Sequence, residues 1–282
     1  MPSLHDFWLG ATTRRRSWRP SGGAPSATTR GTRTDRLPGD LLRTYALLVR
    51  WQALRLKGFL PLAIVVQSLF ALGIVIGYPL LFPEIDPLTI LFLATGAPAI
   101  TLISMGLVAV PQVVAQARLA GSLEYIRSLP VARLVYLFAD LTVWMAIVLP
   151  GVVFALAIGV LRFGLDLDVT PLVVPAFLLV ALTSASVGYA MASVLPPTIA
   201  MLLTQVLVVF VLMFSPLNFP PERLPEWLQA IHAFLPVQAM GEVIRGTVAS
   251  STFPTTVGAW ALLAAWCVGG LGIAYVTLRR RG

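Results

Sequence analysis

Several stretches of this chain exceed the roughly 18 uncharged residues that indicate a membrane-spanning helix. The composition agrees, because 57% of the residues are hydrophobic, only 11% are charged and the mean hydropathy is +0.86. A soluble domain of this length has too much surface to cover with so few charges. We therefore predict an integral membrane protein, which argues against a soluble enzyme, a disulfide scaffold and a nucleic-acid binder.

The apolar runs predict an all-α fold with six transmembrane helices. Each run is close to the ~20 residues that a 30 Å hydrocarbon core requires, although the fifth is short. The expected spans cover residues 59–82, 88–114, 134–161, 171–195, 199–214 and 256–278. Helix kinks are expected at Gly96, Pro98, Pro111 and Pro150.

The positive residues predict the orientation of these spans. Counted by side, 17 of the 20 lysines and arginines fall in the N-terminal segment, the 115–133 loop and the C-terminus, and only Arg162, Arg223 and Arg245 fall opposite. Positive residues are enriched in cytoplasmic loops, so both termini are expected in the cytoplasm. The net charge of +8 therefore reflects topology and requires no nucleic acid.

The N-terminal segment divides into two parts. Residues 1–40 are rich in Arg, Ser, Thr, Gly and Pro and are expected to form a disordered basic cytoplasmic tail. Residues 41–58 are expected to form an amphipathic helix at the inner membrane interface, or else a plain extension of the first span. The helix would place Arg43, Arg50 and Lys57 on one face and Leu47, Trp51 and Leu54 on another.

The chain lacks the sequence signatures of several enzyme classes. It has no H-E-x-x-H, no G-x-S-x-G and no phosphate-binding G-x-x-x-x-G-K-[ST], because its only lysine, Lys57, follows Leu56. We therefore expect no ATP hydrolysis by this chain itself. An intramembrane hydrolase using Ser184 or Ser186 stays open as an alternative. The sole cysteine, Cys267, is interpreted as a small packing residue.

Two segments outside the spans are patterned. Residues 116–133 predict a short amphipathic helix ended by Pro130, suited to docking a soluble cytoplasmic partner or else serving as an interfacial linker. Residues 214–245 predict two short helices broken by Pro236 that lie at or dip into the outer leaflet. On the second helix, Glu242 and Arg245 have the spacing of an ion pair.

Few polar residues lie inside the spans. Asp140 is the only acidic one and is a functional candidate by default, since an unpaired acid at mid-depth costs roughly 3 kcal/mol. Its place near the cytoplasmic end, seven residues after Arg133, favours a structural pair with that arginine. Ser184, Gly188 and Ala192 form a small-residue stripe that favours helix packing over substrate binding.

Two stretches carry a family resemblance: R-L-A-G-S-L-E-Y-I-R-S-L-P-V-A-R before the third span, and F-S-P-L-N-F-P-P-E-R-L-P-E-W-L…L-P-V-Q-A-M-G-E-V-I-R after the fifth. In this order among six spans, over residues 41–280, the chain resembles permease subunits of ABC type-2 exporters. The resemblance implies a cytoplasmic coupling helix that meets an ATPase and contains Arg118, Gly121, Glu124, Pro130 and Arg133. It also implies external re-entrant helices containing Pro220, Leu224, Pro225, Trp227, Pro236, Glu242 and Arg245. The chain departs from the family at Pro216, where Gly is frequent, and at Leu235, where Asn is common.

The resemblance further implies an ATP-driven exporter of a hydrophobic or amphiphilic substrate, such as a drug or a lipid. This chain would bind no cofactor, while ATP and Mg would be held by a dimer of partner ATPase subunits beside a second permease, identical or different. With one lysine against 19 arginines, a GC-rich bacterial genome and hence the bacterial cytoplasmic membrane are expected. The alternatives are an ATP-independent carrier or channel and a non-transporting scaffold.

Overall fold

The computed structural model describes residues 38–58, 60–81, 86–121 and 133–280, in which all regular structure is helical. Six helical segments are long and apolar enough to cross a membrane, as the sequence predicts. Five of them are single helices: α2 (Leu60–Leu81), α6 (Arg133–Phe163), α7 (Val173–Val194), α8 (Pro197–Phe214) and α11 (Val257–Arg280). The predicted all-α membrane fold is therefore confirmed.

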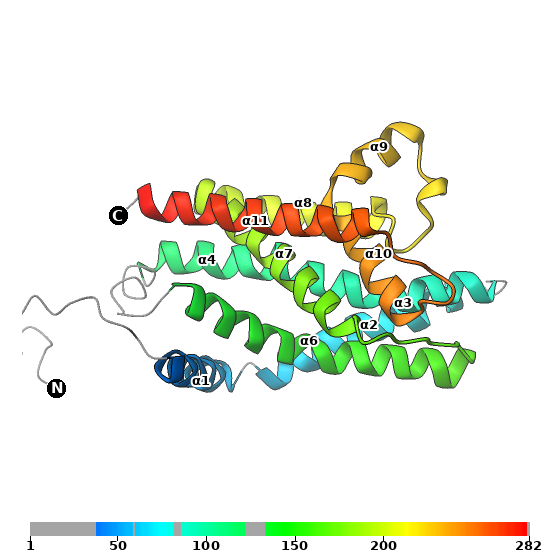
Figure 1. The fold of residues 1–282 in the computed structure, drawn as a ribbon, viewed down its shortest axis with the longest axis horizontal. Helices are drawn as coiled ribbons and strands as arrows, with labels where there is room; N and C mark the ends of the chain where they lie inside the picture. Colours follow the sequence, from blue (N-terminus) through cyan, green and yellow to red (C-terminus); the bar gives the residue numbers. More distant parts are fainter. Residues whose placement is uncertain (1–37, 59, 82–85, 122–132, 281–282) are drawn as a thin grey trace, which may run out of the picture. The chain divides into compact units, whose positions relative to one another are not determined.

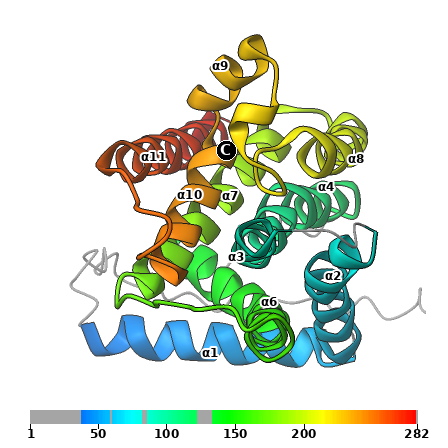
Figure 2. The ribbon, with the colours of Figure 1, turned by 90° about the vertical axis from the view of Figure 1, so that its right-hand side faces the viewer.

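The second span is the centre of the bundle. It is built from α3 (Pro87–Ser104), a π-helical stretch called η1 (Met105–Ala109) and α4 (Val110–Leu119). Its apolar window is 89% buried, against 17% to 56% for the other five spans. α2, α6 and α10 contact α3, while α7 and α8 contact α4, and Figure 2 shows α3 enclosed by its neighbours. A movement of this span must therefore displace the helices that contact it, which make up most of the bundle.

The path of the second span differs from the sequence prediction in two ways. The helix expected to end at residue 114 continues to Leu119, so residues 116–119 belong to the span and not to a separate surface helix. It ends where Gly121 adopts φ +68, the left-handed conformation that glycine provides after a helix C-terminus. The π-helical stretch stands just before Pro111, which cannot donate to the carbonyl four residues earlier and crowds it.

The helix α1 (Pro38–Leu56) lies crosswise to the bundle and packs on α6, as Figure 2 shows. The hydroxyls of Tyr45 and Thr142 share a hydrogen bond of 2.5 Å across this contact. Gln52 of this helix is buried. The basic set that contains Arg50 and the apolar set that contains Leu47 were expected on different faces, but both sets are exposed. Their helical angles are adjacent, so α1 turns one mixed basic and apolar side outward.

The segment after α8 forms two short helices and a single 3-10 turn. After the turn η2 (Pro221–Arg223) come α9 (Glu226–Phe234) and α10 (Pro236–Val248), broken at Leu235 and Pro236 where the sequence predicts. The helix α10 packs against α3, α7 and α11, and almost all of it is buried. In Figure 1, α9 lies above α8 and α11, at one side of the bundle. That either helix dips into the outer leaflet stays a prediction.

Candidate functional site

Arg118 lies in the last turn of α4 and reaches the end of α7. Its Nη1 atom donates hydrogen bonds to the carbonyl oxygens of Ala192 at 2.5 Å and Leu195 at 2.7 Å. The last carbonyls of a helix lack intrahelical donors and carry partial negative charge, so a guanidinium stabilises them. Arg118 thereby fastens the predicted cytoplasmic end of the second span to the turn between the fourth and fifth spans.

The other residues of the expected coupling helix are only partly visible. Gly121 forms the turn that ends α4 and is exposed. Glu124 and Pro130 lie outside the described residues, and Arg133 is the first residue of α6, its side chain also outside them. The role of this segment toward an ATPase stays a prediction.

Asp140 lies one helical turn before Trp144 on α6. The Trp144 indole Nε1 donates to the Asp140 Oδ2 at 3.3 Å. Asp140 is half-buried, and its neighbour Thr142 bonds to Tyr45 of α1, which places the acid near the α1 end of the span. A position at the end of the span with an indole donor favours the structural interpretation of this acid.

The middle of the second span presses directly on α7. A Cβ added at Gly188 would overlap the Gly106 carbonyl oxygen, and one added at Gly106 would overlap the Ser184 side chain, both far inside the 3.0 Å that Cβ atoms keep. Ser184 Oγ also donates to the Leu102 carbonyl at 3.3 Å. The small-residue stripe of α7 therefore serves close helix packing, as the sequence favours.

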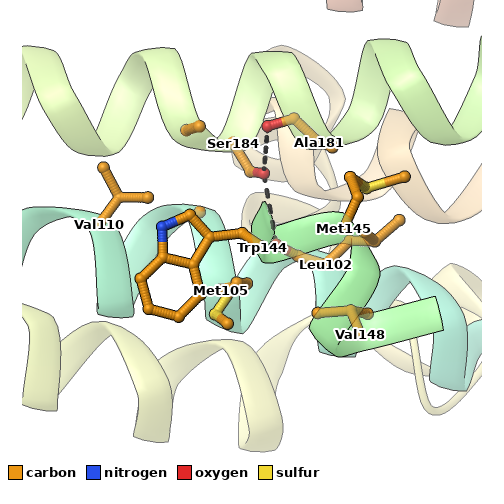
Figure 3. A pocket seen from close by; sticks show the side chains of 10 residues that line it. Leu102, Met105, Val110, Trp144, Met145, Val148, Ala181 and Ser184 are labelled. Atoms are coloured by element: carbon orange, nitrogen blue, oxygen red, sulfur yellow. Dashed lines mark hydrogen bonds between the residues drawn. The ribbon is translucent and has the colours of Figure 1, made fainter. Parts of the chain in front are cut away.

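A small apolar cavity adjoins this contact. Figure 3 shows the Trp144 indole beside Met105 and Val110, under the Ser184 hydrogen bonds. The volume of the cavity is ≈ 20 Å³, about the room one water needs, whereas drug-sized ligands occupy pockets of about 300–1,000 Å³. This cavity cannot hold a substrate of that size.

The outer end carries the second set of expected site residues. Trp227 is 66% exposed on α9, whereas Leu224 and Pro236 are buried at the starts of the two helices. Pro220 and Pro225 directly precede η2 and α9. Leu235 is the N-cap residue of α10 and makes no side-chain cap to it. The expected residues are thus spread over both helices and do not form one cluster.

Arg245 is a buried cation on α10, only 7% exposed. Its guanidinium carbon lies 3.4 Å from the centre of the Phe92 ring and 5.7 Å from that of Phe253, and its Nη2 donates to the Leu217 carbonyl at 3.2 Å. Burial lowers the pKa of Arg245 to about 9, and the charge of Glu242 acts in the opposite direction. The guanidinium is therefore still charged at pH 7.

Glu242 and Arg245, which the sequence places at the spacing of an ion pair, each have further partners of their own. Glu242 Oε1 accepts hydrogen bonds from the Thr256 Oγ1 at 2.7 Å and from the Thr256 backbone N–H at 3.2 Å. Thr256 Oγ1 in turn accepts from the Ala259 N–H at 3.2 Å, the arrangement of an N-cap residue. The Glu242 carboxylate thus supports the start of α11, while its charge also acts on Arg245 and opposes the effect of burial on the pKa of that arginine.

The connection between α6 and α7 is bound to the end of α10. The Thr170 N–H donates to the Thr247 carbonyl at 2.9 Å, and Ser250 Oγ donates to the Asp168 carboxylate at 2.7 Å. The third, fourth and sixth spans therefore meet α10 at the same end of the bundle.

Sequence reasoning missed Phe92, Leu217 and Thr256 as partners of the outer residues. Thr256 directly precedes the apolar run of α11, and a threonine at such a place predicts a helix N-cap, so this residue could have been identified from the sequence. Phe92 and Leu217 lie in apolar surroundings with no distinguishing spacing. Their contacts with Arg245 depend on how α3, α8 and α10 pack.

The family model described as ABC-2 type transporter matches residues 44–248, which is more than half of the chain. The match includes α4 with Arg118 and ends at the last residue of α10. A search of curated proteins finds no match.

Proposed function

Because this chain belongs to the ABC-2 type transporter family, we propose that it is the permease subunit of an ATP-driven exporter. The substrate would be hydrophobic or amphiphilic, such as a drug or a lipid, and would leave a bacterial cell through its cytoplasmic membrane. A permease domain of this family partners an ABC ATPase subunit. ATP and Mg would be bound there and not by this chain.

The family match over the second span is the observation that carries this proposal. That span is the most buried and joins the two ends of the bundle, from Phe92 at one end to Arg118 at the other. A displacement of the α4 end would therefore be transmitted to the outer helices along the uninterrupted helical path of α4, η1 and α3. We place the ATPase contacts at residues 116–133 and on the exposed side of α1. Closure of the ATPase pair would tilt the spans and expose the path outward.

The substrate path is proposed to lie between two permease subunits, identical or different. The cavity between η1, α6 and α7 is too small for cargo, which supports a path outside the single bundle. The faces of α2 and α8 are largely exposed apolar surface, for example Leu69 and Val206. Such surfaces line lipid, a second subunit or an apolar path equally well.

A charge reversal at residue 124 tests the coupling role. The chain would be reconstituted in lipid vesicles with its ATPase, and substrate-stimulated ATP hydrolysis measured for Glu124→Arg and for Glu222→Arg, an exposed residue of the opposite end. Glu124→Arg should abolish coupled hydrolysis while membrane insertion stays intact, and Glu222→Arg should leave both unchanged. Full coupling in Glu124→Arg would remove the docking role. Substrate transport without any ATPase would instead favour the carrier or channel.

A further inference from the structure

The segment from Ser215 to Asn218, here called the outer plug, is buried although it is not helical. Ser215 and Leu217 are 0% exposed and Asn218 is 4% exposed, and Pro216 is also buried. Connecting segments normally run over the surface, because buried irregular backbone is hard to satisfy. The outer plug is therefore held inside the bundle by particular contacts.

Two glycines form the seat of the outer plug. A Cβ added to Gly96 of α3 would overlap the Leu217 carbonyl oxygen, and one added to Gly241 of α10 would overlap the Leu217 side chain. Leu217 therefore fits between two helices only because both lack a side chain at the contact. A larger residue in place of Gly96 would meet the Leu217 backbone and displace the plug, whereas one in place of Gly241 would meet the end of the Leu217 side chain.

Arg245 ties the plug to both helices. Its Nη2 hydrogen bond to the Leu217 carbonyl is the only side-chain hydrogen bond onto the plug backbone within the described residues. The charge itself faces the ring of Phe92 on α3, and such a cation–π contact is strengthened when it is shielded from water. The Arg245 Nε atom is buried without a hydrogen-bond partner among the described residues. While the plug is seated, the hydrogen-bonding capacity of the Arg245 guanidinium is therefore used only in part.

The plug also keeps polar atoms without partners. Ser215 Oγ and Asn218 Oδ1 are buried and, in the part of the chain that the structure describes, accept or donate no hydrogen bond. Asn218 Nδ2 donates to the Leu212 carbonyl at 3.1 Å. Unpaired buried polar groups favour any state in which they reach water. These unpaired groups therefore weaken the seated position of the plug relative to one in which they reach water.

We propose that Arg245 is a positioning residue that latches the outer plug between α3 and α10, and that the plug leaves this seat when the transporter opens outward. Only the release of the plug on outward opening rests on the proposed transport function. The latch itself is a property of this chain. Tilting of α3 would withdraw Phe92 from Arg245 and Gly96 from Leu217 together, so that one movement releases both contacts.

A thiol-labelling experiment tests the latch. Cys267 is the sole cysteine, so Cys267→Ala gives a background in which Ser215→Cys, a nearly isosteric change at an unbonded hydroxyl, is the only thiol. The permease and its ATPase would be placed in vesicles and treated from the plug side with a membrane-impermeant maleimide. Glu222→Cys, exposed just beyond the plug, serves as the reference that reacts in every state.

In the absence of nucleotide, Ser215→Cys should be protected. Adding Arg245→Gln or Phe92→Leu should speed its labelling about tenfold or more, because each removes one of the holding contacts. Phe177→Leu, a similar loss of volume at a buried phenylalanine of α7, should leave the thiol protected. Continued protection in both latch variants would overturn the proposal, as would equal labelling in Phe177→Leu. Phe92→Leu keeps the test valid if Arg245→Gln fails to fold.

The release of the plug on outward opening is tested by trapping the complex of permease and ATPase with ATP and vanadate. Ser215→Cys in the Cys267→Ala background, with Arg245 and Phe92 unchanged, should then react about as fast as in the latch variants without nucleotide. Protection in the trapped complex would refute the link between plug and outward opening while leaving the latch intact. If no ATPase binds or is stimulated by the chain, the proposed function fails, and the nucleotide-free comparison still decides the latch.

Discussion

The Arg118 guanidinium donates a 2.7 Å hydrogen bond to the carbonyl of Leu195, a residue 77 positions later on another span. A second bond to Ala192 makes this a cap shared between two helices. Arg118→Leu should therefore destabilise the protein by roughly 2–4 kcal/mol, since two charge-assisted bonds are lost. Arg118→Lys should cost less, because one donor still reaches a carbonyl. Thermal unfolding in detergent would measure both.

The same substitution separates structure from coupling. If Arg118 acts only as a cap, Arg118→Lys should hydrolyse ATP with its partner nearly as well as the parent protein. A large loss of coupling in a stable Arg118→Lys protein would show that the guanidinium itself takes part at the ATPase contact. Unchanged stability in Arg118→Leu would contradict the cap.

Glu242 and Thr256 should behave as one unit. Glu242→Ala and Thr256→Ala should each lower the free energy of unfolding by about 1–2 kcal/mol, the usual loss of an N-terminal helix cap. Because both remove the hydrogen bond between Thr256 Oγ1 and Glu242 Oε1, the double variant should lose less than the sum of the two single losses. Glu242→Gln keeps an acceptor oxygen and should cost less than Glu242→Ala. Equilibrium unfolding in mixed detergent would supply the four values.

The control for this cycle is Glu222→Ala. Glu222 is exposed in the turn η2 and should change stability little. Strict additivity of the Glu242 and Thr256 effects would mean that the two residues act on separate parts of the molecule.

The positions of the spans could be predicted because hydropathy and charge act locally. The fourth span, expected at 171–195, is the helix Val173–Val194. The bounds depend only on where apolar residues stop and turn residues such as Pro196 begin. The break at Pro236 follows likewise from proline chemistry.

The contacts between spans could not be predicted in the same way. Arg118 contacts Leu195 because the ends of α4 and α7 lie at the same level in the bundle. Arg245 contacts Phe92 because α10 packs beside α3. The local pattern of Glu242 and Arg245 suggested a pair but gave no sign that Thr256, at the start of another helix, donates to the carboxylate. Local spacing therefore identified the important residues without identifying their partners.

His232 should make the outer helices sensitive to acid. It is 1% exposed and its ring stacks on Phe210 at 6.0 Å. Burial lowers the pKa of His232 below its usual 6.5, and the Phe214 backbone carbonyl opposes this only in part. Below pH 6.5 the unfolded chain binds a proton that the folded histidine resists, so stability falls as the pH drops from 6.5 through the lower folded value. Above pH 6.5 this effect vanishes.

The measurement is the melting temperature at pH 7.5 and pH 5 for the parent protein and His232→Phe. The parent should lose more stability on acidification than the variant, which has no titrating ring at this site. His5→Gln removes the only other histidine and should retain the parent's sensitivity. Equal acid sensitivity in the parent protein and His232→Phe would assign the effect to other groups.

Gly188 should be among the least replaceable residues of the bundle. Its Cα faces the Gly106 carbonyl so closely that an added methyl group has no room, and the opposing atom is backbone, which cannot rotate away. Gly188→Ala should therefore force α7 from η1 and cost about 1–3 kcal/mol or more. Gly73→Ala, at a helical glycine with nothing within 4 Å, should be neutral or slightly stabilising, since alanine favours helix. Melting temperatures of the two variants side by side decide the matter, because both add one methyl group to a spanning helix. Equal stability would mean that the second and fourth spans do not approach as closely as the structure places them.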